Sequence, residues 1–214
     1  MKPILCSLLL ALTLINTACT THKANSSSIK SQPIQGWGNA IDPSADCKFL
    51  VGEGELLISV PGTNGPHDLA AEIGITNAPR VLQTVEGDFI IEVVVDGRFS
   101  PGRDSTLPGR TAYNGAGLVL MADPNHGICL ARAVLQYKTG KPLHYANFEM
   151  RTNGKVDGLG NAKQHPLPEK GPILLKLERR GQTVAGAFSS DGAQWLHFLQ
   201  KTFQPAGLKS CKWG

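Results

Sequence analysis

The sequence predicts an all-β protein in which two sheets pack face to face. The clearest strand covers residues 87–99, where side chains alternate strictly between two faces. One face carries Phe89, Ile91, Val93 and Val95, which is typical of an antiparallel strand with one buried face. About ten such runs, spaced about 8–14 residues apart, are the pattern of a two-sheet sandwich. Glycine (24) and proline (14) are abundant among the 214 residues, and no segment has the period of an ordinary helix.

The first residues predict an export signal. Met1-Lys2 precede an apolar run from Ile4 to Ile15, and a run of about a dozen residues is too short to stay in a bilayer as a helix. Cys19 directly follows Ala18 and resembles the lipobox cysteine of bacterial lipoproteins, although Asn16 stands where that motif usually has leucine. Residues 1–18 are therefore predicted to be a signal peptide of the lipoprotein type with Cys19 acylated. An ordinary signal peptide cut near Ala18 is the alternative.

Residues 19–35 predict a flexible polar tether because they are rich in serine and have no hydrophobic period. With Cys19 acylated, the tether would hold the domain, residues 36–214, at the membrane of the bacterial cell envelope. Without that modification the protein would be periplasmic or secreted. The net charge is only +4, and lysine and arginine are scattered rather than clustered, which argues against a nucleic-acid partner.

Within residues 36–214, turn signals separate the predicted strands. Pro61-Gly62 ends the first, and Asn153-Gly154 is the strongest two-residue hairpin signal in the chain. Two long polar loops are expected at 100–114 and 158–171. The extended segments are expected at 55–60, 67–73, 80–83, 87–99, 115–122, 128–137, 147–152, 173–179, 183–189 and 195–203.

An ordered set of short motifs runs through residues 36–203. It consists of Trp37-Gly38, Asp42-Pro43, Asp46-Cys47, His67-Asp68-Leu69, Asn77-Ala78-Pro79-Arg80-Val81, Glu86-Gly87-Asp88-Phe89, Tyr113-Asn114-Gly115-Ala116-Gly117-Leu118, Phe148-Glu149-x-Arg151 and Ser189-x-Asp191-Gly192-x-x-Trp195. The set resembles a bacterial domain of unknown function, often labelled "regulation of enolase", of the concanavalin A-like lectin/glucanase superfamily. The resemblance implies a jelly-roll β-sandwich with a concave face and a carbohydrate ligand, and it implies no established reaction.

The C-terminus departs from that superfamily. Its members return with one or two further apolar strands, whereas Phe203 is followed by a Gln-Pro-Ala-Gly-Leu segment and then only Lys209 to Gly214. The sequence therefore predicts a sandwich that lacks its last strand or strands, through a truncated or frameshifted end. A sheet edge would then remain unpaired.

The candidate ligand-binding residues lie on two neighbouring predicted strands and one loop end. Strand alternation places Asn147, Glu149 and Arg151 on one face, and Arg132 lies on the strand before it. Carboxylate, amide and guanidinium groups suit sugar hydroxyls, and Tyr113 could stack on a sugar ring. The alternative is a solvated face with a cross-strand Glu149–Arg132 ion pair.

No cofactor and no metal site are predicted. Cys47, Cys129 and Cys211 show no Cys-x-x-Cys spacing, and their disulfide pairing is left open. The carboxylates of Asp42, Asp46 and Asp123 match no calcium loop. Adjacent His67 and Asp68 point to opposite faces of an extended chain, which favours a structural or capping role.

Catalysis has little support in the sequence. The Glu-x-Asp-x-x-Glu string of the superfamily's glucanases is absent, and Glu92 and Asp96 would lie about 13 Å apart along one strand, too far for a glycosidase pair. The first hypothesis is thus an exported, lipid-anchored, lectin-like module that binds carbohydrate or a cell-surface polymer without catalysis. A glycoside hydrolase with an unrecognised carboxylate pair and a structural envelope module without a small ligand are the alternatives.

Overall fold

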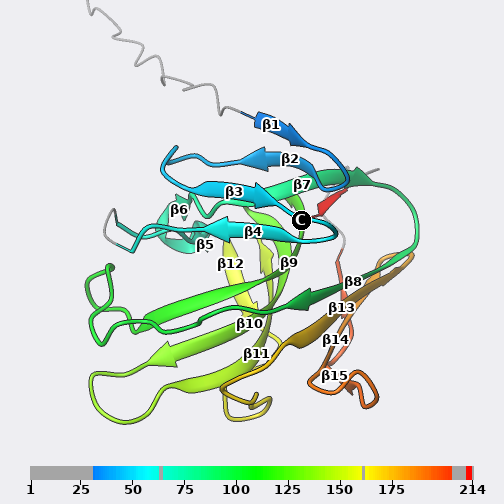
Figure 1. Ribbon diagram of the computed structural model, residues 1–214. Helices are drawn as coiled ribbons and strands as arrows, with labels where there is room; N and C mark the ends of the chain where they lie inside the picture. The colour runs from blue at the N-terminus through cyan, green and yellow to red at the C-terminus, as the bar shows by residue number, and fades with distance from the viewer. Residues whose placement is uncertain (1–30, 63–64, 161, 204–210, 214) are drawn as a thin grey trace, which may run out of the picture.

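The structure is a computed structural model that describes residues 31–62, 65–160, 162–203 and 211–213. It confirms the predicted β-sandwich, with an eight-stranded and a five-stranded antiparallel sheet (Figure 1). The signal segment, Cys19 and most of the predicted tether lie outside the described residues. The first strand begins at Ser31, within the predicted tether. In the described part of the chain, no helix has the length and apolar character needed to cross a bilayer.

The larger sheet holds the long central strands that the alternating runs predicted. Its three longest strands pair as consecutive antiparallel hairpins, with one register shift between His126 and Gly127. In spatial order the strands are β1 (Ser31–Ile34), β2 (Gly38–Ile41), β7 (Arg80–Val85), β17 (Cys211–Trp213), β9 (Ala112–Asp123), β10 (His126–Gln136), β11 (Leu143–Thr152) and β12 (Lys155–Gly158).

The smaller sheet packs against one face of the larger one. Its central strand, β13 (Ile173–Arg180), pairs with the strand predicted at residues 87–99 on one side and with the next strand of the chain on the other. In spatial order the strands are β15 (Leu196–His197), β14 (Thr183–Ser189), β13 (Ile173–Arg180) and β8 (Phe89–Val95), and β16 (Lys201–Thr202) also pairs with β14.

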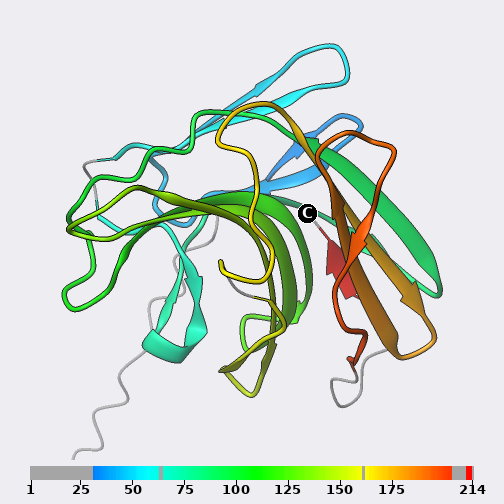
Figure 2. The same ribbon diagram turned by 90° about the horizontal axis from the view of Figure 1, so that it is seen from below.

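Two small hairpins complete the described structure. One pairs β3 (Lys48–Val51) with β4 (Leu56–Ser59). The other pairs β5 (Leu69–Ala70) with β6 (Ile75–Thr76) around a single turn of 3-10 helix, η1 (Ala71–Ile73). Figure 2 shows the larger sheet curving around the β5–η1–β6 segment, on the side opposite the smaller sheet. This segment therefore borders the concave face of the larger sheet.

The hydrophobic core lies between the two sheets. Strand β13, predicted as the extended segment 173–179, alternates: Ile173, Leu175 and Leu177 are buried, at most 1% exposed, and Lys176 and Glu178 lie on the other face. The predicted inward face of β8 is also confirmed, because Val95 is buried and its three partners at positions 89, 91 and 93 pack against the core. The larger sheet contributes Leu118, Leu120, Ile128, Leu130 and Phe148.

The C-terminal residues correct the expectation of an unpaired edge. Cys211–Trp213 forms β17, which pairs with β7 on one side and with β9 on the other. A strand therefore lies between β7 and β9, where the sequence predicted that a last strand would be missing. Three residues are too few to show an alternating pattern, so sequence periodicity could not reveal this strand.

Candidate functional site

Strand β11 carries a row of polar side chains on the concave face. Asn147, Glu149 and Arg151 share this face, as predicted from alternation. Their directly paired neighbours on β10 are small: Ala131, Cys129 and Gly127, respectively. Small side chains on the neighbouring strand leave room beside the three polar groups, of which Asn147 is buried and Glu149 and Arg151 are 19% and 12% exposed.

The polar groups form a continuous chain of contacts that crosses from the sheet to η1. Asn147 Nδ2 donates to Glu149 Oε1 (2.5 Å), and Glu149 Oε2 lies 3.1 Å from an Nη atom of Arg151. Arg151 Nε in turn lies 3.3 Å from Glu72 Oε2. The other oxygen of Glu72 lies 3.4 Å from Arg110, which comes from the long polar loop before β9. The network joins three segments that are remote in the sequence.

Tyr113 borders the same network. A Cβ atom at Gly115 would collide with the Tyr113 hydroxyl, so the ring lies back over this glycine. The side chain is 38% exposed, yet burial of the hydroxyl raises its pKa well above the usual value, and the nearby Cys129, Tyr145, Glu149 and Asp68 raise it further. Tyr113 thus presents a partly exposed ring whose hydroxyl lies over Gly115 and stays protonated at neutral pH.

Asp68 lies beside these side chains, because it interacts with Arg151, Glu72 and Arg110. Together they form the concave-face cluster, which comprises Asp68, Glu72, Arg110, Tyr113, Asn147, Glu149 and Arg151.

Arg132 does not belong to the concave-face cluster, which corrects the sequence-based grouping. Its direct partner on β11 is Ala146, whereas Glu149 pairs with Cys129, so Arg132 and Glu149 lie on opposite faces and the predicted ion pair does not form. Arg132 is 1% exposed. It donates to the carbonyls of Gly171 (2.6 Å) and Glu169 (3.1 Å), and its guanidinium lies 4.9 Å from the Phe99 ring centre. Arg132 therefore holds the segment before β13 against the core through these hydrogen bonds.

Electrostatics within the concave-face cluster are set by burial and by three carboxylates. Burial alone lowers the pKa of Arg151, but the carboxylates of Glu149 and Glu72 outweigh it and raise that pKa. Burial raises the pKa of Asp68, while its hydrogen bond from the Leu69 N–H and the charges of Arg151 and Arg110 oppose the rise. Burial therefore disfavours the charged form of the Asp68 carboxyl in the folded protein.

Replacing Asp68 with asparagine should stabilise the folded protein at neutral pH. Because the pKa of Asp68 is raised on folding, the folded state binds its proton more tightly, and the stability from this group is lost as pH rises through the folded pKa. Asparagine keeps an acceptor for the Leu69 N–H and has no charge to bury. Thermal melts of Asp68→Asn should show a higher Tm than wild type at pH 7.5 and a gain that shrinks towards pH 3. An equal or lower Tm at pH 7.5 would contradict this account.

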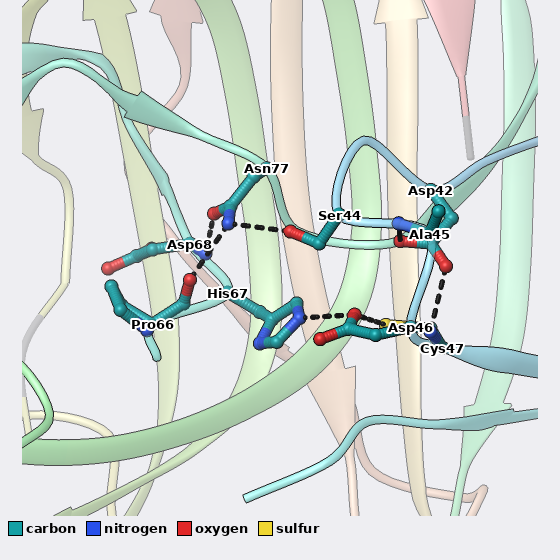
Figure 3. A network of polar contacts seen from close by, with 9 residues as sticks. All are labelled: Asp42, Ser44, Ala45, Asp46, Cys47, Pro66, His67, Asp68 and Asn77. Carbon is teal, nitrogen blue, oxygen red and sulfur yellow. Dashed lines mark hydrogen bonds and ion pairs between the residues drawn. The ribbon is translucent and has the colours of Figure 1, made fainter. Parts of the chain in front are cut away.

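A second polar network lies where the β2–β3 loop meets the segment before β5 (Figure 3). The Asp42 carboxylate accepts hydrogen bonds from the backbone N–H groups of Ala45 (3.1 Å) and Cys47 (2.8 Å). Ala45 has a φ of 56°, an unusual value for a residue with a Cβ. Asn77 connects this loop to the next segment, because its Nδ2 donates to Ser44 Oγ (3.0 Å) and to the Pro66 carbonyl (2.9 Å).

This second network brings three ionisable side chains together. His67 Nε2 lies 2.8 Å from Asp46 Oδ1, and Cys47 Sγ lies 3.4 Å from the same oxygen. The His67 side chain is only 5% exposed. Burial raises the pKa of Cys47 to about 12, and its hydrogen bond to Asp46 adds to the rise, so the thiol is protonated and a poor nucleophile. Figure 3 shows His67 and Asp68 pointing in opposite directions, as expected for neighbours in an extended chain.

An apolar hollow lies elsewhere, at the β15 end of the smaller sheet. Its volume is about 300 Å³, and its lining includes Leu159, His165, His197 and Phe198. The His165 ring packs against Phe198, with 4.3 Å between ring centres, and burial lowers the pKa of His165. These contacts make His165 part of the aromatic packing between the sheets.

Sequence reasoning missed three members of the concave-face cluster: Asp68, Glu72 and Arg110. Each comes from a loop or short turn whose position relative to β11 depends on the whole fold. It also left Asp46, Cys47 and His67 unconnected, although all three fall within the quoted motifs. Their occurrence in one ordered motif set was the available signal, but sequence spacing alone gave no reason to join them.

Comparisons with known proteins support the fold and leave the family open. No protein-family model matches the chain, and no curated protein matches its sequence. A functionally unknown protein from Saccharomyces cerevisiae has a similar structure, with a TM-score of 0.52, 14% identity, and coverage of 83% of this chain and 84% of that one. A xylan β-1,4-xylosidase from Bacillus halodurans C-125 matches with a TM-score of 0.47 and 15% identity. That match covers 70% of this chain but only 30% of the xylosidase. At 14% identity, the likeness to the yeast protein shows the fold alone.

Proposed function

We propose that this protein is a non-catalytic carbohydrate-binding module whose ligand lies on the concave-face cluster. The observation that carries the proposal is the fixed row of polar groups on β11, Asn147, Glu149 and Arg151, continued by Glu72 on η1. Sugar hydroxyls both donate and accept hydrogen bonds, so they suit a surface where carboxylate, amide and guanidinium groups are already oriented. The Tyr113 ring at the rim supplies an apolar surface for a sugar face.

The proposal includes the sequence-based expectations of location and partner. An export signal and acylation of Cys19 would place the module at the cell envelope, where polysaccharides and other surface polymers are available. A single acyl chain binds a membrane only marginally, and the anchors of bacterial lipoproteins carry more than one, which makes the attachment stable. The ligand is accordingly expected to be an envelope or extracellular polymer rather than a cytoplasmic metabolite.

The deciding experiment is a glycan and polysaccharide binding panel with the full chain and its Glu149→Gln variant. Loss of one charged hydrogen-bonding group at the site should weaken binding about 10–100-fold. Glu92→Gln is the matched control, because Glu92 is half-exposed on the smaller sheet, 3.5 Å from Lys176 and away from the concave face. It should bind as wild type does. Equal affinity of Glu149→Gln and wild type would refute the site, and a folded protein that binds no glycan would favour a structural envelope module.

A glycoside hydrolase is the second candidate, and Asp68 is the observation in its favour. Burial raises the pKa of the Asp68 carboxyl, with Glu72 nearby, and a carboxyl whose pKa is raised by its surroundings is what glycosidases use as a general acid. Asp68 would then donate a proton to the leaving sugar, and Glu149 or Glu72 would act as the second carboxylate. Release of reducing sugar by wild type, abolished in Asp68→Asn, would support the hydrolase, whereas binding without release would support the module.

A further inference from the structure

The side chains of Asp46, Cys47 and His67 offer three metal-ligand atoms at one point. The sulfur, the imidazole nitrogen and a carboxylate oxygen all lie within 4.8 Å of one another. In a tetrahedral zinc site, with bonds of about 2.0 Å to nitrogen and oxygen and about 2.3 Å to sulfur, neighbouring ligand atoms lie about 3.3–3.5 Å apart. The Sγ–Oδ1 distance of 3.4 Å already matches this spacing, and the Nε2–Oδ1 distance of 2.8 Å needs to open slightly.

The surroundings hold these three groups in place without a metal. Asp42 fixes the loop by accepting hydrogen bonds from two of its backbone N–H groups. Asn77 joins Ser44 of that loop to Pro66, the residue before His67, and its own Oδ1 accepts the Asp68 N–H (3.1 Å). The loop and the segment before β5 are therefore anchored to a common residue, so little conformational freedom remains to be lost when a ligand bridges them.

We propose that Asp46, Cys47 and His67 bind a divalent transition metal, with Zn²⁺ as the ion whose preferences fit best. Zinc accepts thiolate, imidazole and carboxylate ligands together, whereas Mg²⁺ and Ca²⁺ favour oxygen ligands only. Binding replaces the thiol proton of Cys47, which leaves to solvent, and uses the Nε2 lone pair of His67. The three ligands from the described residues leave a tetrahedral position for water or an exogenous group.

The metal would connect the two networks of the molecule. His67 is adjacent to Asp68, whose side chain points the opposite way into the concave-face cluster. A metal that fixes His67 to the β2–β3 loop therefore also fixes the backbone that presents Asp68. The site itself does not depend on the carbohydrate proposal, because none of its ligands belongs to the concave-face cluster.

The alternative is a purely structural arrangement, a buried histidine bonded to an aspartate beside a small thiol. The chain offers a matched comparison: His126 Nδ1 lies 2.9 Å from Asp123 on the surface and has a second partner in Asn153. That pair includes no cysteine. If any histidine–aspartate pair were enough to bind the metal, both the His67–Asp46 pair and the His126–Asp123 pair would bind it. If the cysteine is also required, only the site at His67 would bind it.

The test is metal binding by the full chain, with Zn²⁺ measured against a competing chelator and Co²⁺ as a spectroscopic probe. We expect one ion per chain and a thiolate-to-Co²⁺ charge-transfer band. Cys47→Ser and His67→Gln should each weaken binding more than about 100-fold, since loss of a ligand exceeds the effect of a lost supporting group. Cys129→Ser and His126→Gln should change it less than about twofold. The proposed site would be wrong if Cys129→Ser or His126→Gln lost as much metal affinity as the ligand variants. It would also be wrong if the charge-transfer band persisted in Cys47→Ser.

A measurement on the unaltered protein covers the case in which a variant fails to fold. X-ray absorption of the zinc-loaded chain should show one sulfur at about 2.3 Å and nitrogen or oxygen neighbours at about 2.0 Å. Zn²⁺ should also raise the Tm of wild type, because an ion that binds only the folded state stabilises it. A zinc shell without sulfur would overturn the proposal whatever the variants do.

Discussion

The Phe148→Ala variant should have a free energy of unfolding about 3–5 kcal/mol lower than wild type. Phe148 lies on β11, is fully buried, and reaches across the core to the smaller sheet. Its ring centre is 5.0 Å from that of Phe198, and a Cβ atom at Gly186 on β14 would lie only 3.1 Å from its ring atoms. The larger and smaller sheets meet at this ring, so alanine would leave a cavity between them.

Denaturant unfolding monitored by circular dichroism measures this loss, with the m value checked for two-state behaviour. Leu57→Ala is the control, because Leu57 is 59% exposed on the β3–β4 hairpin. Its free energy of unfolding should stay within about 0.5 kcal/mol of wild type. A loss below about 1 kcal/mol for Phe148→Ala would mean that the sheets do not pack through this residue.

Phe148 also shows why the fold could be predicted from the sequence. It alternates with Asn147 and Glu149, so apolar and polar positions on β11 separate onto two faces without any knowledge of the partner strands. The same holds for Ile173, Leu175 and Leu177 on β13. A period of two is a local property, and repeated over many short runs it is enough to indicate a two-sheet sandwich.

The site could be predicted only in part, because its geometry depends on register and on distant segments. Alternation placed Glu149 and Arg132 correctly within their own strands, but pairing them required the β10–β11 register. A shift of one residue exchanges the faces, and the actual register pairs Arg132 with Ala146. The contact of Glu72 with Arg151 spans 79 residues, and that of Asp46 with His67 spans 21. No periodic signal reports contacts of this kind.

The Arg132→Ala variant should be about 2–4 kcal/mol less stable than wild type. Alanine removes two hydrogen bonds donated by a charged group, each in the range of about 1.5–3 kcal/mol before compensation. It also removes the contact with the Phe99 ring, worth about 0.5–2 kcal/mol, and the packing of the apolar stem. The carbonyls of Glu169 and Gly171 would lose their donor, so the loop before β13 should loosen first.

The same variant separates a structural arginine from a ligand-binding one. Because Arg132 faces the core and the concave-face cluster faces the other way, the folded fraction of Arg132→Ala should bind any glycan ligand with the wild-type affinity. Denaturant unfolding gives the stability loss, and titration calorimetry well below the Tm gives the affinity. Arg98→Ala, at an exposed position, should change neither. If Arg132→Ala had wild-type stability but weaker glycan binding, Arg132 would be a ligand-binding residue. The assignment of the two faces of the larger sheet would then be wrong.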